Sequence, residues 1–169
     1  MVAYSRGLAR AALALLCLEL CALASSAQPA SYPYSIVGEV VGVTDGDTIK
    51  VLRGGKVFKI RLNGIDAPEL GQAFGKKSKE FLSTLVFRRE VDVVVRDMDR
   101  YGRYIGDVMI DGRSANAELV AAGLAWRYRA YSKDPALAAL EEEARAKRLG
   151  LWADPAPLPP WEFRHKRKQ

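Results

Sequence analysis

Apolar and polar residues alternate with a period of two along much of the chain, the pattern of strands with one buried face. The pattern predicts five strands, at 36–44, 48–52, 57–63, 91–95 and 104–110. Gly54-Gly55 marks a tight hairpin turn between the second and third strands. In the third strand Phe58, Ile60 and Leu62 share one face, so Arg61 points away from the apolar side of its own strand.

A period of 3.6 residues predicts three helices, at 74–88, at 115–122 and from 135 to about 149. Ser114 and Asp134 are typical N-caps of the second and third helices, and Gly123 and Gly150 are typical stops. Five strands and three helices indicate an α+β, mainly β fold. This strand count suits a five-stranded barrel of the OB type.

Residues 1–27 have the pattern of a secretory signal peptide. Arg6 and Arg10 precede an apolar run, and small residues lead to a cleavage site after Ala27. An uncleaved membrane anchor is the alternative, but the run is shorter than the roughly 20 apolar residues that a spanning helix needs, and it contains Glu19. A secreted or periplasmic protein is therefore expected.

The length of 169 residues allows one domain with a real core. We expect a lead-in at 28–34, a domain at 35–152 and a Pro-rich basic tail at 153–169 that hugs the surface or stays mobile. Both cysteines, Cys17 and Cys21, lie in the signal peptide, so the mature chain has no disulfide and no zinc-thiolate site. Cleavage lowers the net charge from +6 to +5, and this basic balance favours a polyanionic partner.

Two acidic groups follow predicted strands. Asp45 and Asp47 lie between the first two strands, and Asp66 and Glu69 come shortly after the third. Each group alone is compatible with a solvated turn. An EF-hand loop is excluded because its twelfth position, counted from Asp45, is Lys56. Together, carboxylates without Cys or His suit a hard cation such as calcium or magnesium.

A third polar group, at 99–103, precedes the last strand. Arg103 could join Arg61 in holding a phosphate, because a planar guanidinium can bind two phosphate oxygens at once. Tyr101, Tyr128 and Tyr131 either stack on bases or pack within the fold.

These three groups, in this order, resemble the motifs of the staphylococcal nuclease (thermonuclease) family, and the resemblance extends over roughly 35–152. It implies an OB-fold barrel with three helices that cuts DNA and RNA with bound calcium. It also implies products with 3'-phosphate and 5'-hydroxyl ends. Magnesium or manganese are alternative cations.

The resemblance also implies roles for single residues. Asp47 and Asp66 would bind the metal through their side chains, Ala67 through its backbone carbonyl and Asp45 through a water molecule. Glu69 would be the general base, and Arg61 and Arg103 would neutralise the charge on the phosphorane. The residues expected to bind substrate are Arg100, Tyr101, Tyr128 and Tyr131. The segment after Glu69 is shorter than the mobile loop of the founding family member, which leaves open how Glu69 is held.

The sequence thus predicts a monomeric, calcium-dependent endonuclease that acts on DNA and RNA, with no stable membrane association after signal cleavage. A non-catalytic nucleic-acid-binding module of the OB type is the main alternative. A membrane-anchored protein whose basic tail contacts anionic lipid is a third hypothesis.

Overall fold

The computed structural model describes residues 33–167, so the predicted signal peptide and most of the lead-in lie outside the described residues. Within this range the longer strands are β1 (Tyr34–Val43), β2 (Thr48–Arg53), β3 (Lys56–Leu62), β5 (Glu90–Met98) and β6 (Tyr104–Ile110). Three two-residue strands accompany them: β4 (Ile65–Asp66), β7 (Arg113–Ser114) and β8 (Trp126–Arg127). The helices are α2 (Gly75–Val86), α3 (Ala115–Ala121), α4 (Pro135–Ala146), the 3-10 helix η2 (Gly150–Ala153) and α5 (Pro160–Lys166).

The five longer strands close into a barrel. They pair in the order β3-β2-β1-β5-β6 through antiparallel ladders. A parallel pairing of β3 with β6, in which Arg61 lies opposite Ile105, joins the two ends of the sheet. The predicted five-stranded OB-type barrel, in a mainly β chain, is therefore confirmed. Closure leaves neither β3 nor β6 as an open edge.

The core fills the barrel and continues under two helices. Ile49, Ile60 and Val93 are fully buried inside it, and the predicted inward face of β3 is confirmed. Leu82 of α2 and Leu119 of α3 extend the same cluster. The apolar faces of these two helices are therefore buried against the barrel.

Helix starts follow the predicted caps. The Ser114 side chain accepts a hydrogen bond from the Ala117 N–H at the start of α3, and Asp134 does the same for the Ala136 N–H at the start of α4. Gly123 and Gly150 approach each other closely, since a Cβ on Gly150 would lie 2.2 Å from the Gly123 carbonyl oxygen. Both have positive φ, so glycine is required here.

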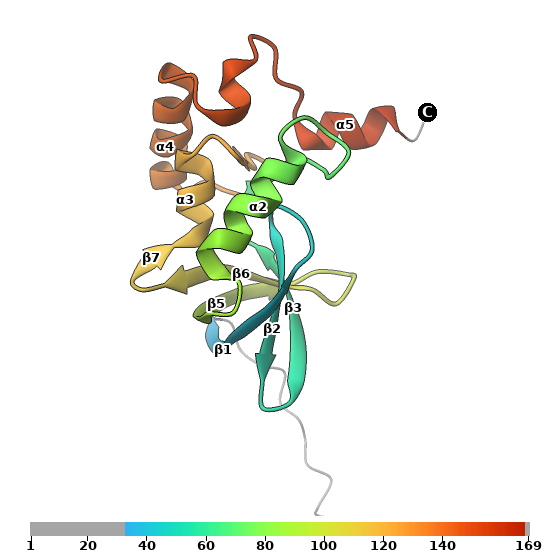
Figure 1. Cartoon of the computed structure of the whole chain (residues 1–169), viewed down its shortest axis with the longest axis vertical. Coiled ribbons are helices and arrows are strands. Elements are labelled where there is room, and N and C mark those ends of the chain that lie inside the picture. Colours follow the sequence, from blue (N-terminus) through green and yellow to red (C-terminus); the bar gives the residue numbers. More distant parts are fainter. Residues whose placement is uncertain (1–32, 168–169) are drawn as a thin grey trace, which may run out of the picture. The chain divides into compact units, whose positions relative to one another are not determined.

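The prediction of three helices is wrong by one. The described chain has a fourth α-helix, α5, in the segment predicted as a basic tail. Pro159 immediately precedes α5, and Pro160 is its first residue. Proline is tolerated at a helix start because the first N–H groups of a helix have no partner within it. Figure 1 shows α3 and α4 side by side, and α5 on the far side of α2 from them. Among the described residues, no helix has the length and apolar character needed to cross a membrane.

Candidate active site

Asp47 reaches the site from a tight turn between β1 and β2. The Asp47 N–H donates to the Asp45 carboxylate at 3.1 Å, and the Leu62 N–H donates to the Asp47 carbonyl at 2.8 Å. Between the two aspartates, a Cβ on Gly46 would lie 2.1 Å from the Ser78 hydroxyl of α2. Only glycine therefore lets this turn pack against α2, and the turn sets the Asp47 side chain inside the site.

Asp66 is placed by the short β4–β8 pair. Asp66 lies opposite Trp126 in this antiparallel ladder, and the Tyr128 N–H donates to the Gly64 carbonyl at 2.9 Å. The Asp66 side chain is almost fully buried. Next along the chain, the Ala67 N–H donates to an Asp47 carboxylate oxygen at 2.7 Å, which brings the two predicted acidic groups together.

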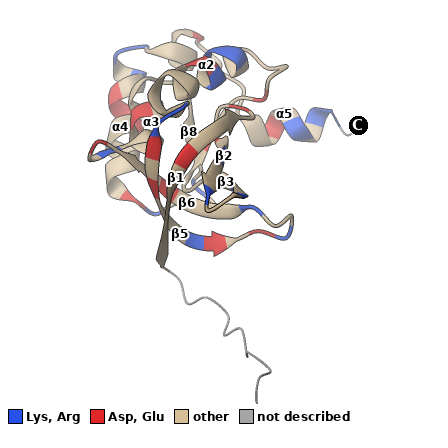
Figure 2. Ribbon diagram, turned by 60° about the horizontal axis from the view of Figure 1, so that its bottom comes forward, with Lys and Arg blue, Asp and Glu red and all other residues tan. Residues whose placement is uncertain are grey.

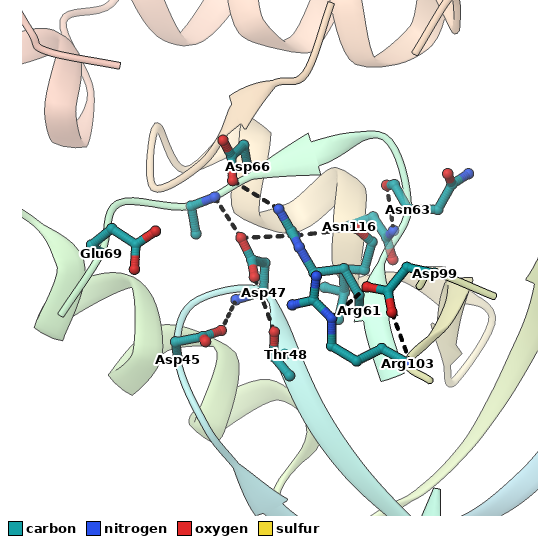
Figure 3. Close-up of polar contacts among 12 residues, drawn as sticks. Asp45, Asp47, Thr48, Arg61, Asn63, Asp66, Glu69, Asp99, Arg103 and Asn116 are labelled. Atoms are coloured by element: carbon teal, nitrogen blue, oxygen red, sulfur yellow. Dashed lines mark hydrogen bonds and ion pairs between the residues drawn. The ribbon is translucent and has the colours of Figure 1, made fainter. Parts of the chain in front are cut away.

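Arg61 joins the two buried aspartates. Its guanidinium lies 2.8 Å from an Asp47 oxygen and 2.7 Å from an Asp66 oxygen, and its side chain is only 14% exposed. In Figure 3, Arg61 lies between these carboxylates and the pair formed by Asp99 and Arg103. The predicted outward direction of Arg61 on β3 thus leads into a polar site rather than into solvent.

Arg164 of α5 extends this arrangement to Glu69. Its guanidinium donates to both Asp66 oxygens, at 2.7 and 3.2 Å, and to a Glu69 oxygen at 2.9 Å. The site is therefore an alternating chain of carboxylates and guanidinium groups: Asp47, Arg61, Asp66, Arg164 and Glu69.

Negative charge exceeds positive charge along this chain. With Asp45 included, four carboxylates face two guanidinium groups. Burial raises the pKa of Asp47 to about 7, and the negative charges of Asp45 and Asp66 act in the same direction. Arg61 and the Ala67 N–H act against this rise, but they do not cancel it. With all four carboxylates ionised, the site would be short of two positive charges.

This donor set fits a hard divalent cation by its chemistry, because every available donor is a carboxylate or carbonyl oxygen. Within residues 33–167, no three His, Cys, Asp or Glu side chains are grouped as ligands of one ion. Arg61 bridges Asp47 to Asp66, and Arg164 bridges Asp66 to Glu69. A cation would therefore share these carboxylates with the two arginines.

Arg103 lies beside the site and is held by Asp99. Its Nε donates to one Asp99 oxygen at 2.6 Å, and its backbone N–H donates to the other at 3.0 Å. Partial burial opposes a low pKa for Asp99, but these hydrogen bonds from Arg103 lower it below its usual value. Asp99 thus stays ionised and fixes the direction of Arg103.

The predicted substrate-binding residues lie in two places. Arg100 and Tyr101 are in the loop between β5 and β6, where the Arg100 guanidinium donates to the Tyr101 hydroxyl at 2.8 Å. Tyr101 and Tyr131 are 70% and 75% exposed, while the Arg100 guanidinium lies over the Tyr101 ring and Tyr128 contacts the Tyr131 ring. Tyr128 is partly buried and stacks on Trp161 of α5, with ring centroids 5.5 Å apart.

Sequence reasoning missed four residues that shape the site. The Thr48 hydroxyl donates to Asp47, and Gln72 accepts from the Glu69 N–H. Asn116 accepts from the Val108 N–H and donates to the Asn63 carbonyl, which fixes the end of β3 just beyond Arg61. The fourth is Arg164. The available signal was that Arg164 lies three positions after Trp161, in a segment that begins with two prolines. This spacing indicates that the two side chains share a helix face, but not which residues that face contacts.

Comparisons with known proteins show the family of the chain. A family model described as staphylococcal nuclease homologue matches residues 59–154. Protein ParB of Escherichia coli is 45% identical over an alignment of 140 residues, and the match covers 76% of this chain and 79% of that protein. A micrococcal nuclease of Shigella flexneri is 44% identical over 142 residues, 78% and 82% of the two chains. A protein of Escherichia coli O157:H7 named as an uncharacterized endonuclease is 46% identical over 133 residues, 78% and 87% of the two chains.

The barrel and its site define an OB-fold protein in which buried carboxylates and arginines from distant segments meet at one place. The family model covers more than half of the chain, and the relatives span most of it. The chain belongs to the staphylococcal nuclease family.

Replacing Arg61 with methionine should destabilise the fold, because Asp47 and Asp66 would lose a shared partner within a buried site. Breaking a buried pair by removing one partner costs about 3–5 kcal/mol. We expect the free energy of unfolding to fall toward the lower end of that range, since Arg164 still pairs with Asp66. Urea denaturation without added divalent cation measures this change.

Arg113→Met is the matched control. Arg113 pairs with Glu118 on the surface, where both side chains are at least one third exposed. Its loss should lower the free energy of unfolding by about 1 kcal/mol or less. Equal losses for the two variants would show that the Arg61 pairs behave as surface pairs.

Proposed function

We propose that this chain is a calcium-dependent endonuclease that hydrolyses phosphodiester bonds in DNA and RNA. The observation that supports the proposal is the Arg61 guanidinium shared between buried Asp47 and Asp66, with Glu69 and Arg103 on either side. The family membership and the nuclease names of close relatives point in the same direction.

Asp47 and Asp66 are the residues that would hold the cation through their side chains. The Ala67 carbonyl would add a backbone oxygen, and Asp45 would act through a water molecule. Calcium, or magnesium or manganese in its place, would supply Lewis-acid stabilisation of charge on the phosphate. With all four carboxylates ionised, the site would carry two unbalanced negative charges, which match the charge of such an ion.

Glu69 is the proposed general base. Its carboxylate is about one third exposed, so a water molecule can reach it. The base removes a proton from the attacking water, and a phosphorane with an extra negative charge forms. Arg61 and Arg103 would bind that charge, and preorganised donors of this kind stabilise the transition state more than the ground state. Cleavage of the bond to the 5' oxygen, which takes up a proton from water as it leaves, would give a 3'-phosphate and a 5'-hydroxyl.

Exposed aromatic residues would position the nucleic acid. Tyr101 and Tyr131 present accessible rings on which bases can stack, whatever their identity. Arg100 next to Tyr101 and the ring of Tyr128 would contribute further contacts. Contacts of this kind to backbone and base faces carry little sequence information, so we propose a sequence-tolerant enzyme.

A plasmid assay tests this function. The protein is recovered from the periplasm or the medium of producing cells, which also tests the predicted export. It is then incubated with circular plasmid and with RNA, with calcium and with chelator. We expect cleavage of both substrates only with calcium, and fragments that accept a 5' label without prior phosphatase treatment. Binding to intact substrate under calcium, magnesium and manganese alike would instead favour a non-catalytic binding module.

Glu69→Gln should remove most of the activity and leave binding intact. Loss of a general base costs about 100- to 10,000-fold in rate, whereas the amide keeps the size and the polar character of the side chain. Rates with excess calcium and the affinity for single-stranded DNA are the two measurements. Glu80→Gln, an exposed position of α2, is the control and should change neither. A Glu69→Gln enzyme with an unchanged rate would exclude Glu69 as the base.

A further inference from the structure

Helix α5 lies outside the region that the family model covers, which ends at residue 154. The helix is short and basic in its last turn, as Figure 2 shows. A basic surface helix of this kind would ordinarily keep its charges in solvent. Arg164 instead points back to the acidic residues that follow β3.

Aromatic contacts fix α5 against the rest of the domain. Trp161 stacks on Tyr128 with nearly parallel rings and meets Trp126 edge to face, at centroid distances of 5.5 and 5.6 Å. Trp126 belongs to β8, the strand that pairs with Asp66. The ring contacts therefore dock α5 on the same short strand pair that positions Asp66.

A second link connects the segment before α5 to the loop after Glu69. The Gln72 side chain donates to the Leu158 carbonyl at 2.5 Å, and its oxygen accepts from the Glu69 N–H at 3.2 Å. The Glu69 carbonyl in turn accepts from the Gln72 N–H. The short segment after Glu69 is thus tied to the C-terminal segment on one side and to Glu69 on the other.

Arg164 completes the connection at the Glu69 carboxylate. Among the described residues, the only side chain that forms a hydrogen bond or ion pair with this carboxylate is Arg164, at 2.9 Å. Burial alone would lower the pKa of Arg164, but the hydrogen bonds to Asp66 and Glu69 more than offset this effect and raise it. The guanidinium therefore stays charged, and it holds Asp66 and Glu69 through three hydrogen bonds.

We propose that Arg164 is a positioning residue of the active site, delivered by α5, which sets the direction of the Glu69 carboxylate and offsets the charge of Asp66. This inference rests on the proposed function. The C-terminal helix thereby supports Glu69, which stands just before a short loop in this chain. Arg164 acts through Glu69, so its loss should slow the chemical step more than it weakens substrate binding.

Two readouts that move in opposite directions test this proposal. In Arg164→Gln, kcat at saturating calcium should fall about 10- to 100-fold with little change in KM, because the base is misplaced. Calcium affinity without substrate should rise about 10-fold, because one positive charge has left the site. A variant whose only defect was lower stability would lose both catalytic activity and calcium affinity.

Arg164→Lys separates charge from geometry. It keeps the positive charge but loses the two-pronged contact that a guanidinium makes with carboxylates. Calcium affinity should stay close to that of the wild type, while kcat should remain reduced. Lys166→Gln removes one charge from the same helix at an exposed position, and it should change neither quantity.

A double-mutant cycle with Glu69→Gln shows whether Arg164 acts through Glu69. In the Glu69→Gln background, the further change Arg164→Gln should lower kcat by less than about threefold, because the group that Arg164 positions is already lost. An equal fold loss in both backgrounds, or an unchanged or increased kcat in Arg164→Gln, would overturn the proposal. A wild type that cuts no nucleic acid would instead reject the proposed function.

Discussion

Burial of Asp47 and Asp66 side by side is the constraint on which the site depends. Two carboxylates taken out of water repel each other, and each needs a partner close at hand. Arg61 meets this need from β3 by contacting both, and Arg164 adds a second guanidinium from α5. Counted with Asp45 and Glu69, the ionised carboxylates still outnumber the two guanidinium groups, and burial raises the pKa of Asp47. This charge balance is the physical basis for the proposed cation site.

Closure of the barrel places distant parts of the chain next to each other, and the charged residues of the site come from those parts. The β3–β6 pairing and Asn116 fix the end of the strand that carries Arg61, and the β4–β8 pairing fixes Asp66. Ala67 then joins β4 to the β1–β2 turn through its hydrogen bond to Asp47. The same β8 strand supports the aromatic contacts of α5. Fold closure and site assembly therefore depend on the same few backbone pairings.

Local patterns predict most of this fold and part of the site. Alternation gave the five barrel strands, and Ser114 and Asp134 gave the helix starts, because both signals depend on neighbouring residues alone. Arg61 and Asp66 were found because they lie five positions apart and belong to a family motif. Arg164 was not, since 98 positions separate it from Asp66 and a basic run ordinarily indicates a solvated tail. The two-residue strands β4 and β8 were also missed, because so short a segment has no period.

The central claim is that buried carboxylates short of positive charge form a divalent-cation site. Calorimetric titration of calcium into the protein without nucleic acid tests it most directly, for the wild type, for Asp66→Asn and for Asp92→Asn, an exposed control on β5. We predict binding by the wild type and the control, and affinity lower by about 10- to 100-fold or more in Asp66→Asn. Equal affinities in all three proteins, or no binding by the wild type, would contradict the account.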